Sequence, residues 1–501
     1  MVVVCGLVGL ATCFWVIALL IFGSSIRPVC SSRVNEKEHP MSPVASASKP
    51  SVKGKQPLPA EWKTGLHGIP VTRYTHREFA KLEAELFWPK VWQMACRIDQ
   101  IPSPGSYTVY DILNESIVVV RADENTVKAY HNVCPHRATA LALGSGRFQL
   151  GQIICPFHGW KWNLLGENTY VPERQEFKGS CLSDQEIHLR EVHVEVWAGF
   201  VYINLDKNPT PFEQNIAPIQ DIVDGVKLGD MKFHWHISTR VNANWKVAQE
   251  AFIEAYHVPQ THPQLIGGRT PEVANSIWTY EPMANGHGLF HSAGASSMGR
   301  LPKTLLEAMS QEEQTDTLLR SLSNMYVGHD SMVHAEEVDI ARTMRRRKLP
   351  EGVTVGQEFQ KVIREHYAAQ ARSIGEFEAL ARCTDMHIFP HITFLPSFGN
   401  AVMYRARPTK DNDPDWCIFD MYSIRTYPEG QTPPKWETRN IEGDLKDPKN
   451  WYLIPSQDFT SVTRQQQGMH SMAIRTTLMA EKQESLIVNM HRELDKYLEA
   501  T

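Results

Sequence analysis

The chain has 501 residues, of which 42% are hydrophobic and 21% are charged. This composition excludes a disordered or fibrous protein, and the length is enough for two packed domains. With 51 Lys and Arg against 56 Asp and Glu, the net charge is -5, which gives no reason to expect nucleic acid as a partner. Nine cysteines are too few for a secreted disulfide scaffold.

The N-terminus begins with an apolar stretch, Val2 to Phe22, and the first charged residue is Arg27. A helix of that length rises about 30 Å, enough to cross a bilayer's hydrocarbon core. Because cations follow the stretch, the positive-inside rule places the rest of the chain in the cytoplasm. The sequence therefore predicts a single-pass membrane protein with a transmembrane anchor at residues 1–26. The alternative is that Met41 is the true start, which would give a soluble cytoplasmic protein.

The next segment is rich in Ser, Pro and Lys, as in SPVASASKPSVKGKQPLP at residues 42–59. It has no hydrophobic period, so we predict a flexible linker at residues 27–60. The remainder shows no internal repeat.

Two short Cys/His loops follow, Cys134-Pro135-His136 and Cys155-Pro156-Phe157-His158, with the spacing C-x-H-x18-C-x2-H. Such a set suits either a structural zinc ion or a Rieske 2Fe-2S cluster, with two Cys on one iron and two His on the other. Zinc sites usually keep like ligands together, whereas each loop here pairs one Cys with one His. The prolines after both cysteines and the Gly159-Trp160 pair also favour the Rieske interpretation.

The stretches that flank these loops, residues 116–120 and 194–205, are rich in β-branched and aromatic side chains. We expect the loops to project from a small antiparallel sheet.

With these loops, the chain resembles the catalytic (alpha) subunits of the Rieske non-haem iron oxygenases, the ring-hydroxylating dioxygenases, from about Trp62 to the C-terminus. The resemblance implies one 2Fe-2S cluster per chain, held by Cys134, His136, Cys155 and His158, and one Fe(II). It also implies an α+β fold. A β-rich Rieske domain is expected at residues 61–205. A catalytic domain with a helix-flanked antiparallel sheet, of the SRPBCC/START-like kind, is expected at residues 206–501.

A second motif, NWKVAQEAFIEAYHVPQTH, starts at Asn244. Its period predicts a helix on which Glu250, Glu254 and His257 recur on one face, until Pro259 interrupts it. His257 and His262, with a carboxylate from elsewhere, would complete a 2-His-1-carboxylate Fe(II) site that leaves positions open for O2 and substrate.

The third ligand is expected in the C-terminal part. Asp458, followed by Val462, Gln466 and Gly468, has a spacing similar to that of the family's ligand-bearing helix, so the resemblance implies Asp458. Asp420, on a predicted strand, is the weaker candidate.

Glu254 stands three residues before His257. The family usually has Asp at this position, where it bridges the iron-bound histidine to a cluster histidine of a neighbouring subunit. The resemblance therefore implies that Glu254 orients His257 and carries the electron route, with Glu250 as the second candidate. It also implies a ring of subunits, most simply a homotrimer, with a beta subunit as a further possibility.

The chain has no G-x-G-x-x-G after a strand and no plant-type ferredoxin motif. Electrons would come from NAD(P)H through a separate reductase, with or without a ferredoxin. The basic run at residues 345–348 is interpreted as a solvated helix end, the alternative being a docking patch for an acidic electron donor.

Residues 301–382 show helical spacing of apolar positions and are expected to cover or line the substrate pocket. Residues 401–407 and 416–425 alternate as antiparallel strands do. Phe389, Phe394 and Phe398 are expected to lie in the core of this sheet.

These patterns together predict an oxygenase that hydroxylates an organic substrate, most simply an aromatic or other cyclic apolar compound, as in the catabolism of aromatic hydrocarbons. The alternatives are a monooxygenase or demethylase acting on a quaternary amine or methylated compound, a membrane-anchored Rieske electron carrier, and a zinc-stabilised binding protein. The H-x4-H motif and the long chain beyond the cluster domain argue against the electron carrier.

Overall fold

The computed structural model describes residues 58–177, 182–266, 270–292 and 308–499, all within one compact unit, Lys53–Thr501. The predicted anchor at residues 1–26 lies outside this part of the chain, as does nearly all of the predicted linker. No helix among the described residues has the length and apolar character that a membrane span requires. The prediction of a single-pass membrane protein is corrected to this extent: the part of the chain that the structure describes holds no spanning helix.

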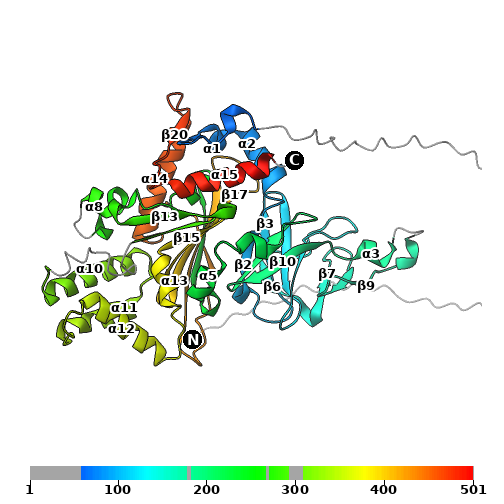
Figure 1. Ribbon diagram of the computed structural model, residues 1–501. Coiled ribbons are helices and arrows are strands. Elements are labelled where there is room, and N and C mark those ends of the chain that lie inside the picture. The colour runs from blue at the N-terminus through cyan, green and yellow to red at the C-terminus, as the bar shows by residue number, and fades with distance from the viewer. Residues whose placement is uncertain (1–57, 178–181, 267–269, 293–307, 500–501) are drawn as a thin grey trace, which may run out of the picture. The chain divides into compact units, whose positions relative to one another are not determined.

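The N-terminal part is built from two antiparallel sheets (Figure 1). One has seven strands in the order β2-β11-β10-β5-β4-β3-β6, and the other three in the order β7-β8-β9. The strands are β2 (Gln93–Arg97), β3 (Ser106–Ile112), β4 (Glu115–Arg121), β5 (Val127–His131), β6 (Ser145–Arg147), β7 (Gln152–Ile154), β8 (Lys161–Asn163), β9 (Asn168–Tyr170), β10 (Glu191–Trp197) and β11 (Phe200–Asn204).

Strand β4 contains an unbroken run of four apolar residues, Ile117 to Val120. Successive side chains of a strand point to opposite faces, and here both faces are buried. Ile117 and Val119 belong to the main hydrophobic core, while Val118 and Val120 belong to a smaller core around the Cys/His loops. The loops therefore have a core of their own on one side of the sheet.

An eight-stranded sheet forms the C-terminal part, in the order β13-β14-β15-β16-β17-β18-β12-β19. Neighbours pair antiparallel except β12 and β19, which are parallel. Both predicted strands are present, as β17 and β18, and Phe389, Phe394 and Phe398 are buried. The strands are β12 (Lys232–Val241), β13 (Trp278–Pro282), β14 (Gly288–Ser292), β15 (Asp385–Ile388), β16 (Ile392–Ser397), β17 (Asn400–Pro408), β18 (Cys417–Arg425) and β19 (Thr438–Ile441).

Helices flank this sheet: α6 packs on β17 and β18, α14 packs on α6, and α15 packs on β13 and β14. The helices are α1 (Thr72–Thr75), α2 (Arg77–Leu82), α3 (Asp184–Ile187), α4 (Phe212–Ile216), α5 (Gln220–Val226), α6 (Trp245–Glu250), α7 (Val258–Thr261), α8 (Pro271–Ser276), α10 (Gln311–His329), α11 (Ala335–Thr343), α12 (Val355–Ala368), α13 (Phe377–Arg382), α14 (Leu453–Met469) and α15 (Ser485–Glu499).

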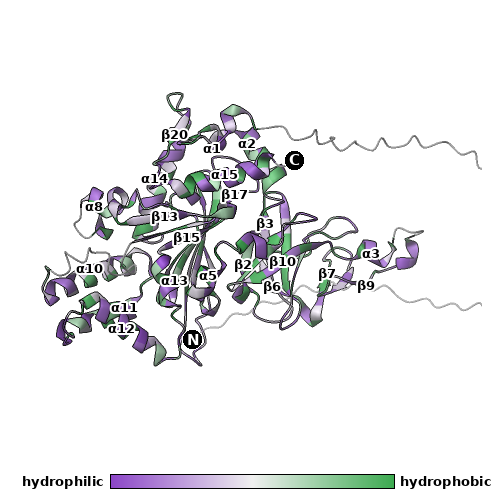
Figure 2. Cartoon of the chain, in the orientation of Figure 1, coloured by the Kyte–Doolittle hydropathy of each residue, from purple (hydrophilic) through white to green (hydrophobic). Residues whose placement is uncertain are grey.

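The helical segment predicted at residues 301–382 is present from α10 to α13, and residues 301–307 of it lie outside the described chain. Figure 2 shows both hydrophilic and hydrophobic residues on α11 and α12, as expected of helices with one buried face. The basic run stands at the end of α11, where Arg345 pairs with Asp316 and Arg347 with Glu358. Two of its four cations are thus engaged within the chain, which fits the helix-end interpretation.

The residues before β2 pack on the C-terminal part. Strand β1 (Gly68–Pro70) pairs with β20 (Thr476–Leu478), and Arg73 forms an ion pair with Asp495 on α15. The segment before β2 therefore packs against β20 and α15 near the C-terminus.

A buried arginine joins the eight-stranded sheet to the N-terminal sheet. Arg405 on β17 pairs with Asp420 on β18 at 2.7 Å, and donates to the backbone oxygens of Met94 and Ala95 on β2 at 2.8 and 3.0 Å. Burial alone would raise the pKa of Asp420, but the Arg405 guanidinium and His236 hold it well below its usual range. Asp420 is therefore already occupied as a structural anion.

We predict that Arg405→Met lowers the free energy of unfolding by about 3–5 kcal/mol, because it leaves the Asp420 carboxylate buried without its cation. Urea unfolding followed by circular dichroism measures this. Arg342→Met is the control, because Arg342 pairs with Asp339 on the exposed surface and should change stability by less than about 1 kcal/mol. Equal effects of the two variants would contradict the structural role of Arg405.

Candidate active site

His257, His262 and Asp458 converge at one point. The Nε2 atoms of His257 and His262 lie 3.5 and 2.8 Å from Oδ1 of Asp458, and the two rings are 5.3 Å apart at 75°. The ligand atoms of all three residues lie within 4.8 Å of one another. His262 and Asp458 are buried, and a quarter of the His257 side chain is exposed. Two imidazoles and one carboxylate in this arrangement suit an Fe(II) ion with positions left open.

The backbone around the two histidines differs from the predicted helix. Helix α6 ends at Glu250, and a turn leads to the short helix α7, which has His257 before its first residue and His262 after its last. Pro259 stands at the start of α7, where its missing N–H is tolerated. Glu250, Glu254 and His257 therefore do not share a helical face, and Tyr256 is 53% exposed.

The outer nitrogens of both histidines are held by hydrogen bonds. Glu254 Oε1 contacts His257 Nδ1, and the same carboxylate accepts the backbone N–H of His257 at 3.0 Å. Gln457 Oε1 lies 2.9 Å from His262 Nδ1 and accepts from Gln264 at 2.8 Å. Such partners fix the tautomer and orientation of metal-binding imidazoles, so that both Nε2 atoms face the carboxylate.

Gln457 was not singled out from the sequence. The signal available was its place beside Asp458, but two neighbours on a helix point in different directions. Only the packing of α14 against α7 shows that Gln457 reaches His262.

Burial and neighbouring charges shift the pKa values of His257 and Asp458 in opposite directions. For His257, burial would lower the pKa, but the carboxylates of Glu254 and Asp458 together raise it to about 10. For Asp458, burial would raise the pKa, but His262 and His257 lower it overall. The site thus holds a carboxylate that stays ionised and therefore favours a cation.

Helix α14 is held in register by Gln466. Its Oε1 accepts the backbone N–H of Asn244 at 3.0 Å, and its Nε2 donates to Asp415 at 2.6 Å. The Asn244 side chain caps α6 by accepting from the backbone N–H of Lys246. One buried contact thus fixes the helix that carries Asp458 against the start of the segment that carries the histidines.

Glu250, the second candidate for the bridging role, belongs to a different buried cluster. Its Oε1 accepts from Tyr74 at 2.9 Å and lies 2.7 Å from His491 Nε2. Burial raises its pKa to about 8. Glu254, and not Glu250, is the acid that contacts His257.

The two Cys/His loops have the same backbone pattern. In each, the cysteine N–H bonds to the carbonyl five residues later, Thr139 or Trp160, at 2.9 Å. The cysteine carbonyl accepts from the residue four places later, Ala138 or Gly159, and both have positive φ, 59° and 73°. The two cysteines are therefore presented by two similar turns, one after β5 and one between β7 and β8.

The side chains of these loops meet at one end. Cys134 and Cys155 are both buried, and burial raises the pKa of Cys134 to about 11. The rings of His136 and His158 lie 4.7 Å apart. His136 stacks on Trp160 at 5.1 Å, and burial and His158 lower its pKa.

His136 Nδ1 is buried without a hydrogen-bond partner. A buried polar atom without a partner is costly, and a metal bond would satisfy it. Two thiols and two imidazoles, one with this orphaned nitrogen, fit a 2Fe-2S cluster.

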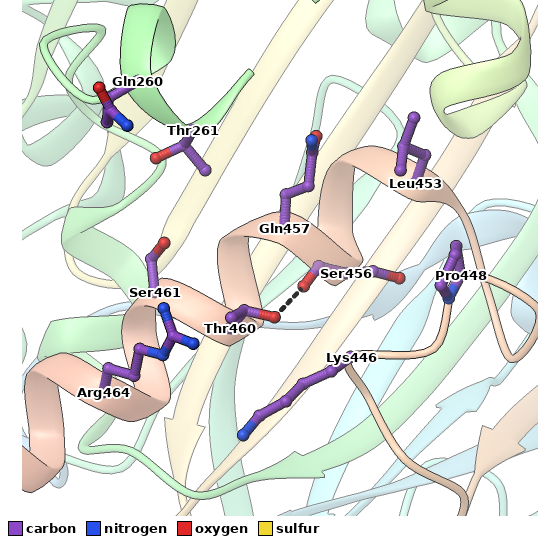
Figure 3. Close-up of a pocket in the computed structure, with 10 residues that line it drawn as sticks. All are labelled: Gln260, Thr261, Lys446, Pro448, Leu453, Ser456, Gln457, Thr460, Ser461 and Arg464. Carbon is purple, nitrogen blue, oxygen red and sulfur yellow. Dashed lines mark hydrogen bonds between the residues drawn. The ribbon is translucent and has the colours of Figure 1, made fainter. Parts of the chain in front are cut away.

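A polar pocket of about 360 Å³ lies between α7 and α14, and Figure 3 shows its lining residues. Gln457 belongs to this lining and also contacts His262, so the pocket adjoins the triad through one side chain. The lining consists of Gln260, Thr261, Lys446, Pro448, Leu453, Ser456, Gln457, Thr460, Ser461 and Arg464.

Two family models match the chain. The model of the ring hydroxylating alpha subunit (catalytic domain) matches residues 228–500, which include the triad, and that of the Rieske [2Fe-2S] domain matches residues 91–188, which include both Cys/His loops. The chain belongs to the ring-hydroxylating alpha-subunit family. This confirms the predicted class and α+β fold, with a 2Fe-2S cluster and a mononuclear iron as its cofactors.

Among the relatives, the carnitine monooxygenase oxygenase subunit of Escherichia coli (strain K12) is 30% identical over 39% of this chain and 52% of its own length. The chloroplastic choline monooxygenase of Spinacia oleracea is 31% identical over 39% of this chain and 45% of its own. The chain thus spans about half the length of the curated relatives it matches.

Solved structures share the fold at low sequence identity. A quaternary ammonium Rieske monooxygenase has a TM-score of 0.60 at 18% identity, covering 89% of this chain and 100% of its own. A naphthalene 1,2-dioxygenase with bound indole has a TM-score of 0.58 at 17% identity, covering 86% and 92%.

We predict that Asp458→Asn lowers the iron content by about one atom per chain, while the EPR signal of the reduced cluster is unchanged, because only the mononuclear site loses a ligand. Asp420→Asn is the matched control: it is expected to lower stability but to keep the iron. The opposite result, iron lost in Asp420→Asn and kept in Asp458→Asn, would transfer the ligand role to Asp420.

Proposed function

We propose that this protein is a Rieske oxygenase that inserts one oxygen atom from O2 into a substrate carrying a quaternary ammonium group. The observation that carries the oxygenase assignment is the presence, in one chain, of the Cys/His loops and of the His257, His262 and Asp458 triad. An electron carrier needs only the loops, and a structural zinc site needs no triad.

In this proposal Cys134, His136, Cys155 and His158 hold the cluster, and the triad holds the iron. The reaction consumes O2, two electrons and two protons, and converts one C–H bond into C–OH with release of water. The metal centres supply the O2 chemistry and the electrons. The chain's residues keep both Nε2 atoms of the triad aimed at one point, through Glu254 and Gln457, and keep Asp458 ionised.

The substrate class rests on the relatives, which are named for carnitine, glycine betaine and choline. The prediction of aromatic hydrocarbon catabolism finds no such support, because the likeness to naphthalene dioxygenase is one of fold. Hydroxylation of a carbon attached to the ammonium nitrogen gives an unstable product that releases an aldehyde and an amine. Because these relatives are named for quaternary amines, we favour such a substrate over an aromatic compound.

We propose residues 61–205 as the Rieske domain and 206–501 as a catalytic domain of the SRPBCC/START-like kind. The two family matches fall within these limits. The segment from β1 to α2, although it precedes the Rieske match, packs on C-terminal elements.

Electron delivery is proposed to run between subunits of a homotrimer, with Glu254 at the contact and a separate reductase as the source. His158 and Phe157 are exposed, so the imidazole end of the cluster site is open to a partner. Beside the triad, Tyr256 is 53% exposed and His257 is a quarter exposed. Both ends of the route thus reach the surface, as a contact between two subunits requires.

The substrate proposal predicts that carnitine, glycine betaine or choline gives O2 consumption matched by aldehyde release, because dealkylation follows hydroxylation next to nitrogen. The measurement uses purified protein, a reductase system and NAD(P)H, with product analysis by mass spectrometry. Naphthalene and the uncharged carbon isostere of choline, 3,3-dimethylbutanol, are the controls. Hydroxylated naphthalene with no product from any ammonium compound would favour the aromatic substrate.

The assembly proposal predicts that Cys134→Ser and His257→Ala chains are inactive alone but recover part of the activity when co-expressed. Mixed rings pair an intact cluster on one subunit with an intact iron on the next. Activity of purified mixed oligomers, carrying two different affinity tags, is the readout. Mixed rings that form without any recovered turnover would favour electron transfer within one chain.

A further inference from the structure

A second group of two histidines and one aspartate lies outside the triad. His234, Asp330 and His334 bring their ligand atoms within 4.8 Å of one another. His334 Nδ1 lies 2.8 Å from Asp330 Oδ1, and His234 Nε2 lies 3.3 Å from Asp330 Oδ2. The two rings are 4.8 Å apart and nearly perpendicular. The donor set is the same as that of the triad.

Three separate elements supply these residues. His234 belongs to β12 and sits where the pairing with β18 shifts register, between Phe233 and Trp235. A β-bulge of this kind re-aims a side chain and is common beside functional sites. His334 precedes the first residue of α11 and His329 ends α10, with Asp330 directly after it.

The backbone of Asp330 is locked in place. Its φ and ψ are 41° and 54°, a left-handed conformation that is uncommon outside glycine, although Asp adopts it more readily than most residues. Its carbonyl accepts from Trp235 Nε1 at 2.8 Å and from Ser423 Oγ at 3.4 Å. The bulge and this turn therefore converge on one carboxylate.

The charges around the cluster leave Asp330 available to a cation. The nearby arginines Arg372 and Arg425 both pair with Glu336 at 2.9 and 2.8 Å. Within the described residues, the Asp330 carboxylate pairs with the two imidazoles.

The two nitrogens of each ring differ in their surroundings. His234 Nδ1 and His334 Nε2 are buried and have no hydrogen-bond partner, and the whole of His334 is 4% exposed. These two nitrogens face away from Asp330, so an ion bound at the cluster would leave them as they are. In the described part of the chain, His234 Nε2 and His334 Nδ1 contact Asp330, and these are the nitrogens that a shared ion would take.

We propose that His234, Asp330 and His334 form a second metal site, which takes a divalent transition-metal ion of the Zn²⁺ type. Two imidazoles and one carboxylate leave a fourth position for water, and more than a quarter of the His234 and Asp330 side chains is exposed to admit it. The ion would tie the junction of α10 and α11 to β12. The proposal does not depend on the oxygenase function, because binding needs no turnover.

The test is a Zn²⁺ titration by calorimetry on the full-length, cluster-containing protein with His257→Ala and His262→Ala. These substitutions remove the triad, so the second site is measured by itself. We expect one Zn²⁺ per chain. Adding Asp330→Asn should weaken binding by more than the roughly 10–100-fold that loss of a second-shell partner costs.

His366→Ala in the same background is the matched control, because His366 also faces a carboxylate, Glu336, at 2.6 Å, but in a cluster of arginines. It should leave Zn²⁺ binding unchanged. His234→Ala serves as the second variant if Asp330→Asn does not fold, as judged by the cluster's EPR signal and circular dichroism. The proposal is overturned if the background protein binds no Zn²⁺, or if neither variant weakens the binding more than His366→Ala does.

Discussion

The buried hydrogen bond between the Asn244 backbone and the Gln466 side chain is the constraint on which the iron site depends. The histidines and the carboxylate are about two hundred residues apart in sequence, so no local pattern can bring them together. Gln466 fixes α14 against α6, and this places Asp458 opposite His262. A neutral contact suits this task because it specifies geometry without adding a charge beside the ion.

The packing of these elements also determines the role of each of four acidic side chains. Glu250, Glu254, Asp420 and Asp458 are all carboxylates near the right places in the sequence, yet the structure separates them. Asp420 is the partner of a buried arginine, Glu250 contacts Tyr74 and His491, and Glu254 turns back onto His257. Only Asp458 faces both imidazoles. Burying a carboxylate without a cation is costly. Asp420 faces Arg405 and Asp458 faces two imidazoles, whereas burial raises the pKa of Glu250 to about 8.

The Cys/His loops were the part of the site most open to sequence reasoning. Their ligand types, spacing and prolines lie within a few residues of one another, and the turns that present them depend on local backbone conformation. Gly159, with φ of 73°, shows this dependence, since a positive φ is easiest for glycine. By contrast, the predicted continuous helix through His257 was wrong, because a turn after Glu250 interrupts it before Pro259 does.

The sequence by itself predicted the cofactor chemistry, the strands at residues 401–407 and 416–425, and the two histidines of the triad, because each follows from residue type at short spacing. It predicted the α+β class through the family resemblance that these motifs carry. Only the tertiary structure decided the features that no short spacing encodes. These are the contact of Gln457 with His262, the end of α6 at Glu250, and the meeting of His234, Asp330 and His334. The physical reason is the same in each case: a bulge, a left-handed turn or a helix register aims the side chain, and these are set by packing between distant segments.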